Sequence, residues 1–182
     1  MNIAVYCGAS IGDRPVYMEM ARELGLWIGS HGHDLVYGAG RRGLMGAVAD
    51  GVLETGGKVY GVIPEFLCKM ESKHDGLTET EVVKTMSVRK QLMIDKSDAF
   101  VALPGGPGTL EEIVEIISLV RLDQTKKPCI VYNLNGFYDP LKNMYQMMAD
   151  RQFVQQEFLD RIIYPTDLEQ VFTLLSKQSR KK

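Results

Sequence analysis

The chain has 182 residues, of which 45% are hydrophobic and 24% are charged, and its formal net charge is −2. These values suit one globular domain with a sizeable core, and the small net charge argues against nucleic acid as a partner. No apolar run approaches the roughly 20 residues that span a bilayer, and the N-terminus lacks the pattern of a signal peptide, so we expect no membrane association.

Short apolar segments alternate with segments of helical periodicity along the whole chain. The predicted strands are residues 2–7, 34–38, 58–63, 81–85, 99–103 and 128–133. Helices are predicted at residues 15–29, 43–55, 87–96, 109–122 and 138–149, with further helix after residue 152. The strands are mostly apolar on both faces, which is typical of a buried parallel sheet. The alternation therefore predicts an α/β fold, a doubly wound parallel sheet in a three-layer α/β/α sandwich.

No repeat, linker or low-complexity tract interrupts this pattern. We therefore expect residues 1–182 to form a single domain, with a frayed tail from about residue 177 that includes the basic stretch SRKK. In doubly wound sheets, ligands bind at the carboxyl ends of the strands near the point where the strand order reverses. Three loops follow the carboxyl ends of predicted strands and are therefore candidates for a ligand site. They are 7–13 (CGASIGD), 37–46 (YGAGRRGLMG) and 104–109 (PGGPGT).

The second loop contains the pattern G-x-G-x-x-G at Gly38, Gly40 and Gly43. A dinucleotide fingerprint would normally lie on the first βαβ unit, with an acidic residue ending the next strand. Here the pattern lies on the second unit, and the next strand reaches a proline before Glu65. Backbone amides that bind a mononucleotide phosphate are favoured instead. Arg41 and Arg42 either assist that phosphate or face water.

The third loop continues into a predicted helix as PGGPGTLEEI. Thr109 and Glu112 fit the capping box T-x-x-E, so a tight turn and a capped helix account for much of the stretch. Capping does not require the glycines, however, and Gly105, Gly106 and Gly108 leave the backbone bare, as a closely approaching ligand would require. A glycine loop for phosphate beside carboxylates suits a ligand with one anionic end and one end that becomes cationic. A sugar that passes through an oxocarbenium ion has this character.

Two cations precede the strand that leads into this loop. In the segment MSVRKQLM (86–93), Ser87 is the predicted helix cap, which puts Arg89 and Lys90 in the first turn. The helix dipole disfavours positive charge at that position. We expect these residues either to border the same cleft or to be balanced by nearby carboxylates.

The cysteines and histidines indicate no metal site. Cys7, Cys68 and Cys129 are far apart and form no CxxC pair, which is typical of free thiols in a reducing cytoplasm. His31 and His33 lie in SHGHD, a predicted turn entering a strand, without a cysteine or carboxylate at ligand spacing.

Several of these stretches together resemble the LOG family of cytokinin riboside 5′-monophosphate phosphoribohydrolases. They are CGAS, LVYGAGRRGLMGAVADG, GVIPEFL, MSVRK, ALPGGPGTLEE and PCIVYNLNGFYDPL. The resemblance runs from about residue 2 to residue 165. The family signature P-G-G-x-G-T-x-x-E is matched by residues 104–112, and its arginine-lysine pair by Arg89 and Lys90.

The resemblance implies a Rossmann-like homodimer that hydrolyses the N-glycosidic bond of nucleoside 5′-monophosphates without a redox cofactor. The cysteines and histidines add the expectations of a cytoplasmic location and no metal. The products would be the free base and ribose 5-phosphate. By this analogy Arg89 and Glu112 are the catalytic pair. The residues that would contact substrate are Glu71, Lys90, Gly105, Gly106, Pro107, Gly108, Thr109, Leu110, Glu111 and Ser118.

The chain departs from the family pattern at two places. Pro107 occupies the variable position of the signature, where an aromatic residue is often found, and the second loop reads GAGRRG instead of a triple glycine. Relatives also carry the older label of lysine decarboxylase, but nothing in the chain indicates a pyridoxal phosphate site. The alternative interpretation is a non-catalytic nucleotide or molybdenum-cofactor carrier on the same fold, which has no need to keep Arg89 and Glu112 together.

Overall fold

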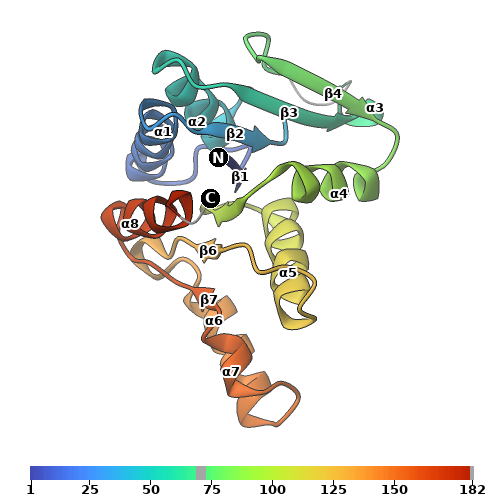
Figure 1. Ribbon diagram of the computed structural model, residues 1–182, viewed down its shortest axis with the longest axis vertical. Helices are drawn as coiled ribbons and strands as arrows, with labels where there is room; N and C mark the ends of the chain where they lie inside the picture. Colours follow the sequence, from blue (N-terminus) through green and yellow to red (C-terminus); the bar gives the residue numbers. More distant parts are fainter. Residues whose placement is uncertain (69–72, 181–182) are drawn as a thin grey trace.

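The computed structural model describes residues 1–68 and 73–180, and its strands form a seven-stranded parallel sheet in the order β4-β3-β2-β1-β5-β6-β7 (Figure 1). The strands are β1 Asn2–Tyr6, β2 Asp34–Tyr37, β3 Val59–Pro64, β4 Glu79–Val83, β5 Ala99–Ala102, β6 Cys129–Val131 and β7 Ile162–Ile163. No helix among these residues is long and apolar enough to cross a membrane.

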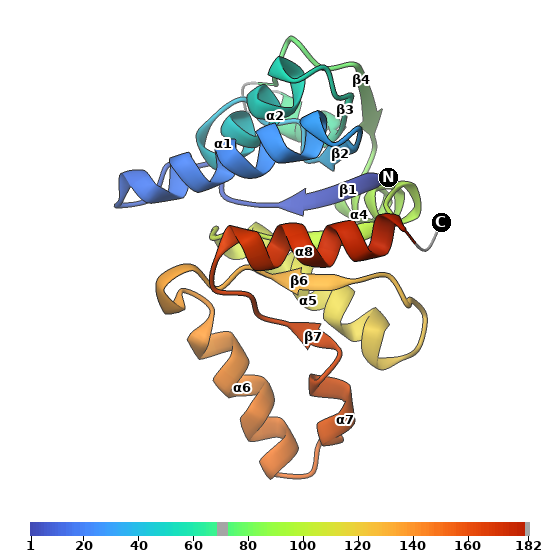
Figure 2. The same ribbon diagram turned by 60° about the vertical axis from the view of Figure 1, so that its left-hand side comes forward.

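Helices cover both faces of the sheet. They are α1 Pro15–Ser30, α2 Gly43–Glu54, α3 Glu65–Cys68, α4 Met86–Lys96, α5 Pro107–Arg121, α6 Asp139–Asp150, α7 Gln156–Leu159 and α8 Leu168–Ser179, with a 3₁₀ turn η1 at Leu134–Gly136. α1, α2 and α8 pack on one face, whereas α4 and α5 pack on the other. α6 and α7 extend past the β7 end of the sheet (Figure 2). The predicted three-layer α/β/α fold is confirmed.

The central strand β1 shows why the sheet is buried on both sides. Ile3 and Val5 point into the core beneath α1 and α2, while Ala4 and Tyr6 point into the core beneath α4 and α5. Side chains alternate between the two faces of a strand, so a strand covered by helices on both sides must be apolar throughout. The same burial pattern recurs in β5, all four of whose residues are buried.

The strand order reverses next to β1, because β2 lies on one side of it and β5 on the other. Tyr6 and Ala102 are register partners, so β1 and β5 end at the same level. The loops that follow stay joined for a few residues, since Gly8 N–H donates to the Pro104 carbonyl over 3.1 Å. They then diverge into α1 and α5, and this divergence opens the crevice in which doubly wound proteins bind ligands.

The elements differ from the sequence-based prediction at one strand end and by two short additions. The strand expected at 81–85 is β4, which ends at Val83 because Thr85 is the N-cap of α4 and accepts a hydrogen bond from Val88 N–H at 3.2 Å. The tail that the sequence predicts to fray from about residue 177 includes the last residues of α8, which continues to Ser179. Neither the short edge strand β7 nor α3 was predicted, since two and four residues carry too little periodicity to be recognised.

The packing of α1 on α2 yields a stability prediction. A Cβ atom on Gly25 of α1 would lie 2.2 Å from the Val48 carbonyl oxygen of α2. Alanine is favoured over glycine inside a helix by about 0.5–1 kcal/mol. We nevertheless expect Gly25→Ala to lower the free energy of unfolding by about 1–3 kcal/mol, because the backbone of α2 must move to accept the methyl group. Urea unfolding measures this change.

The exposed neighbour Glu23 on the same helix supplies the control. Glu23→Ala should change the free energy of unfolding by no more than about 0.5 kcal/mol. A Gly25→Ala variant more stable than wild type would contradict the close contact between α1 and α2.

Candidate active site

A cavity of about 430 Å³ lies at the reversal of the strand order. Its walls come from the loop after β1 (residues 7–13), the start of α2, and the loop after β5 together with the first turn of α5. Arg89 of α4, Glu112 of α5, Tyr17 of α1 and Phe137 after β6 complete the lining. The cavity is therefore built from the carboxyl ends of several strands, as expected for this fold.

The glycine loop leads directly into the N-terminus of α5. The helix begins at Pro107 with Gly106 as N-cap, so the predicted capping box of Thr109 and Glu112 is wrong. Proline is favoured at the first helical position because its fixed φ angle suits the helix there, and this moves the start of α5 two residues earlier. Thr109 is thus inside the first turn, where its hydroxyl lies against Gly105, since a Cβ atom on that glycine would be 2.2 Å from Thr109 Oγ1.

The first turn of α5 has the features of an anion site. Gly106 caps the helix without a side-chain hydrogen bond, so no side chain satisfies the first amides. A Cβ atom on either Gly106 or Gly108 would meet no atom within 4 Å, and both glycines line the cavity. Exposed amides and the positive end of the helix dipole attract phosphate and carboxylate groups.

Arg89 and Glu112 face each other at the inner end of the cavity. Arg89 Nη2 lies 3.6 Å from Glu112 Oε1, and the two side chains are 7% and 9% exposed. Arg89 Nε–H also donates to the Val62 carbonyl of β3 over 3.1 Å. The guanidinium fits only because residue 38 is glycine, since a Cβ atom there would be 2.0 Å from Nη2. β3 and the loop after β2 therefore fix the arginine opposite the carboxyl group.

The environment of Glu112 moves its titration toward neutrality. Burial raises the pKa of this carboxyl group to about 7, because the charged form loses hydration. The nearby Arg89 acts in the opposite direction and lowers the pKa, whereas Glu111 raises it. A group with a pKa near neutrality exchanges protons readily at physiological pH, which suits an acid or base catalyst.

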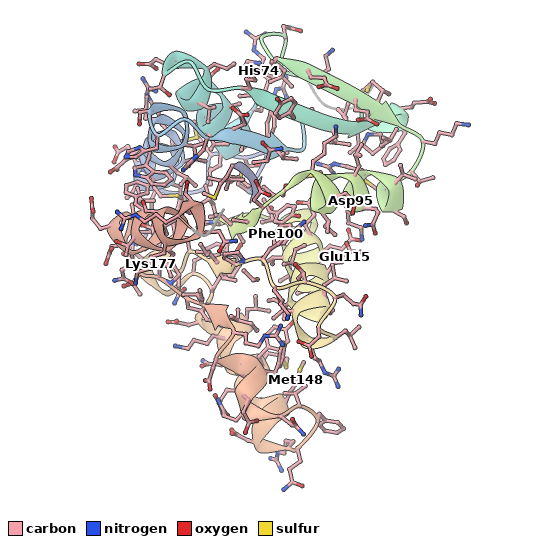
Figure 3. All side chains as sticks on the ribbon, viewed as in Figure 1. His74, Asp95, Phe100, Glu115, Met148 and Lys177 are labelled. Carbon is pink, nitrogen blue, oxygen red and sulfur yellow. The ribbon has the colours of Figure 1, made fainter. Side chains whose placement is uncertain are left out.

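Lys90 lies between two other carboxylates of α5. Its Nζ is 2.8 Å from Glu111 Oε1 and 3.2 Å from Glu115 Oε2. The hydrogen bond that Lys90 donates to Glu111 is the main reason that the pKa of Lys90 is raised. Glu115 lies on the part of α5 next to α4, as Figure 3 shows. The cation is therefore balanced by carboxylates, and the helix cap is Thr85, not Ser87 as predicted.

The structure separates the predicted site residues into two groups. Those that line the cavity are Arg89, Gly105, Gly106, Pro107, Gly108, Thr109 and Glu112. Lys90, Leu110, Glu111 and Ser118 lie outside this lining, on α4 and α5. Ser118 is exposed and donates to the Val114 carbonyl at 2.9 Å. Glu71 lies outside the described residues.

The loop after β2 is not arranged as a phosphate cradle in the cavity. Its glycines and its two arginines are not among the cavity-lining residues, and Arg41 instead pairs with Asp75 at 3.0 Å. The glycines make room for protein atoms, since a Cβ atom on Gly40 would be 2.7 Å from the Met45 sulfur. Only Leu44 and Met45 of this loop reach the cavity. The expected phosphate role of the second loop is therefore not supported.

Sequence reasoning missed two aromatic residues at the cavity. Tyr17 at the start of α1 and Phe137 after β6 both line it, and their rings meet edge to face with centroids 6.2 Å apart. Phe137 follows the carboxyl end of a strand, so the rule that selected the three loops would have found it if applied to β6 as well. Tyr17 carries no comparable signal. Among the described residues, no cluster of histidine, cysteine, aspartate or glutamate side chains could hold a metal ion.

The fold and the site together define a class, namely Rossmann-like α/β proteins with a glycine loop and a helix N-terminus at the strand-order reversal. A family model described as "Possible lysine decarboxylase" matches residues 45–175. The cytokinin riboside 5′-monophosphate phosphoribohydrolase of Rhodococcoides fascians is 41% identical, over 92% of this chain and 85% of its own. The enzyme LOG of Oryza sativa subsp. japonica is 42% identical, over 95% of this chain and 72% of its own. The chain belongs to the LOG family.

Solved structures of lower identity share the fold. The molybdenum cofactor carrier protein of Chlamydomonas reinhardtii is 21% identical with a TM-score of 0.73, covering 98% of each chain. The molybdenum cofactor binding protein of Rippkaea orientalis is 20% identical with a TM-score of 0.73, covering 97% of this chain and 95% of its own. At this level of identity the similarity shows the architecture alone.

The raised pKa of Glu112 predicts a pH-dependent stability. Folded chains keep a proton on this group up to about pH 7, whereas an unfolded glutamate releases it near its ordinary value of 4.5. The folded state thus binds more protons between these values, so its stability falls as the pH rises through that window. Glu112→Gln stays neutral throughout. We expect the stability of wild type relative to E112Q to fall by on the order of 2–3 kcal/mol from about pH 4 to about pH 8.

Urea unfolding of both proteins at the two pH values measures this difference. Glu169→Gln, at an exposed position on α8, is the control and should show no such change with pH. A difference between wild type and E112Q that is constant with pH would contradict the raised pKa.

Proposed function

We propose that this chain is a phosphoribohydrolase that hydrolyses the N-glycosidic bond of a nucleoside 5′-monophosphate, either a cytokinin riboside 5′-monophosphate or AMP. The observation that carries the proposal is the buried Glu112 beside Arg89. Glu112 lies about one helical turn after the glycine-rich N-terminus of α5, which has no side-chain cap. A phosphate and a sugar of one ligand could occupy these two places at once. The relatives named as such enzymes support the same substrate class.

The phosphate binds at the first turn of α5 in this proposal. Gly105, Gly106 and Gly108 present backbone amides, and Thr109 adds a hydroxyl donor. Anion binding at a helix N-terminus requires no side-chain cation. The absence of a P-loop lysine from this loop is therefore consistent with a monophosphate ligand, because there are no further phosphates for such a lysine to reach.

Glu112 and Arg89 carry out the chemistry. As the bond between the base and C1 of the ribose breaks, positive charge develops on the sugar, and the carboxylate of Glu112 stabilises it or accepts a proton from the attacking water. Arg89 stabilises the departing base by donating to it. The oxygen of the water ends on C1 and the base leaves with a proton, which yields the free base and ribose 5-phosphate.

The second group of predicted residues extends the substrate site along α5. We propose that Lys90, Leu110, Glu111 and Ser118, together with Pro107 at the cavity, contact parts of the nucleotide beyond the phosphate. Pro107 lines the cavity, whereas the other four residues lie on α4 and α5 outside the cavity of a single chain.

We also propose that the protein is a homodimer. Large apolar side chains are exposed at the end of the molecule formed by α5, α6 and the turn after α6, with Leu122 62%, Met144 51%, Met147 55% and Phe153 77% exposed. α6 has no buried residue over its whole length. Apolar exposure of this kind marks an interface more often than a monomer surface.

The central test is base release from AMP and from isopentenyladenosine monophosphate. Wild type should release base and ribose 5-phosphate from at least one of them, as measured by chromatography. We expect Glu112→Gln to lower kcat by about 10²- to 10⁴-fold, since the variant cannot accept a proton or carry charge. AMP binding, measured by calorimetry, should change little.

The exposed variant Glu169→Gln is the control, and its rate should match that of wild type. A wild-type protein that binds both nucleotides but releases base from neither would contradict the hydrolase and favour the carrier alternative. No nucleotide binding at all would contradict both.

Light scattering tests the dimer. We expect wild type to show twice the mass of the chain and Phe153→Glu to show a shift toward the monomer, because a buried charge at an interface is strongly unfavourable. Val82→Glu, at another exposed apolar position on the opposite edge strand β4, should leave the mass unchanged. A monomeric wild type would contradict the proposal.

A further inference from the structure

A histidine outside the cavity has both of its ring nitrogens engaged. His74 is 8% exposed, and its Nε2 lies 2.9 Å from Asp50 Oδ1 on α2. Gly76 N–H donates to His74 Nδ1 over 3.0 Å. A nitrogen that accepts a hydrogen bond carries no proton, so the proton lies on Nε2 and is donated to the carboxylate. The imidazole is therefore held in one tautomer and one orientation, as a linking group would be.

The segment that carries His74 is attached to the loop after β2. His74 N–H donates to the Ala39 carbonyl over 3.0 Å, and Lys73 forms an antiparallel bridge with Gly40. Asp75 pairs with Arg41 at 3.0 Å. Three consecutive residues, 73–75, thus contact three consecutive loop residues, 39–41. Figure 3 shows His74 near α2, at the end of the molecule distant from α6 and α7.

The loop needs such support at one residue in particular. Ala39 is fully buried and has a φ angle of +64°, in the left-handed region that a residue with a Cβ atom seldom adopts. Strained conformations of this kind persist only where the surroundings hold them. The hydrogen bond from His74 N–H ends on the carbonyl of this same residue.

The residue before Ala39 is in contact with the catalytic arginine. A Cβ atom on Gly38 would be 2.0 Å from Arg89 Nη2, so the backbone at this glycine forms the surface on which the guanidinium lies. Arg89 is otherwise held on this side by the hydrogen bond from Nε to the Val62 carbonyl. A small movement of the loop would therefore change the position of Arg89 relative to Glu112.

We propose that His74 and Asp50 are positioning residues for Arg89, acting through Ala39 and Gly38. Asp50 holds the imidazole, the imidazole holds its own segment against the loop, and the loop fixes the guanidinium opposite Glu112. The kinetic consequence rests on the proposed function, whereas the structural link from Asp50 to Arg89 does not. Neither residue lines the cavity, so neither acts on substrate directly.

Variants at Asp50 test the link without disturbing the core, because its side chain is 66% exposed. Asp50→Ala removes the acceptor for His74, whereas Asp50→Asn keeps an acceptor oxygen at the same place. We expect kcat for base release to fall by about 10- to 100-fold in Asp50→Ala, since small misplacements of catalytic groups have effects of this size. Asp50→Asn should restore most of the rate. KM should change less than kcat, because the phosphate loop is not involved.

Glu54→Ala is the matched control. Glu54 lies one turn further along α2 and pairs with Arg22 of α1 at 2.7 Å, so its removal also breaks an exposed contact of α2. Its kcat should equal that of wild type. If Glu54→Ala and Asp50→Ala lower kcat equally, or if Asp50→Asn is as slow as Asp50→Ala, the proposal is wrong.

A double-mutant cycle shows whether the effect passes through Arg89. In an Arg89→Lys background, Asp50→Ala should cause little further loss of kcat, because coupled residues are not additive. The same loss as in wild type would mean that Asp50 acts independently of Arg89 and would overturn the proposal.

A readout without turnover separates this inference from the proposed function. The Arg89 Nε–H that donates to Val62 should exchange slowly with water in wild type and faster in Asp50→Ala, as observed by nuclear magnetic resonance. Unchanged exchange would overturn the inference. A wild type that releases no base would contradict the hydrolase alone, and the exchange measurement would still decide whether Asp50 and His74 position Arg89.

Discussion

The constraint on which the site depends is the burial of a carboxyl group next to a guanidinium. Glu112 and Arg89 are both less than a tenth exposed, yet their nearest atoms are 3.6 Å apart, longer than the roughly 2.7–2.9 Å of a charge-assisted hydrogen bond. A tight ion pair would hold the carboxylate ionised and use up its oxygens. At the observed separation burial outweighs the attraction, the pKa of Glu112 rises to about 7, and the oxygens remain accessible to a ligand.

Several other parts of the fold hold Arg89 in its position. A buried guanidinium needs acceptors. Within the described part of the chain, the Arg89 side chain makes one hydrogen bond of ordinary length, to the Val62 carbonyl of β3, and a longer contact of 3.8 Å to the Met86 sulfur. Gly38 supplies space, and residues 73–75 hold the loop that contains it. β3, the loop after β2 and helix α5 therefore meet at Arg89. With five N–H donors on the guanidinium group, several remain to donate to a ligand.

The site was predictable from the sequence where the signal is local. The apolar strands β1 and β5 and the bare glycines after β5 can be recognised without tertiary information, and so can the first turn of α5, although not its cap. Thr109 and Glu112 satisfy the capping box as a pattern, but Pro107 and Gly106 start the helix earlier, and the sequence does not show which of two compatible starts is used. The role of Gly38 could not be predicted from the sequence for a different reason. Its neighbour is Arg89, more than 50 residues further along the chain, so the pattern G-x-G-x-x-G could not show whether the space beside the glycine accepts a ligand or a side chain.

The carboxylates of α5 explain why Lys90 can lie in the first turn of α4. Helix dipoles disfavour a cation in the first turn, but three glutamates of α5 face this part of α4. Glu111 and Glu115 would each raise the pKa of Glu112 by like-charge repulsion, and Lys90 binds both of them while itself lowering that pKa. Arg89 is the larger of the two cationic influences that lower the pKa of Glu112, and Lys90 adds to it. The unfavourable placement of Lys90 in the helix therefore offsets part of the like-charge repulsion that Glu111 and Glu115 exert on the buried carboxyl group.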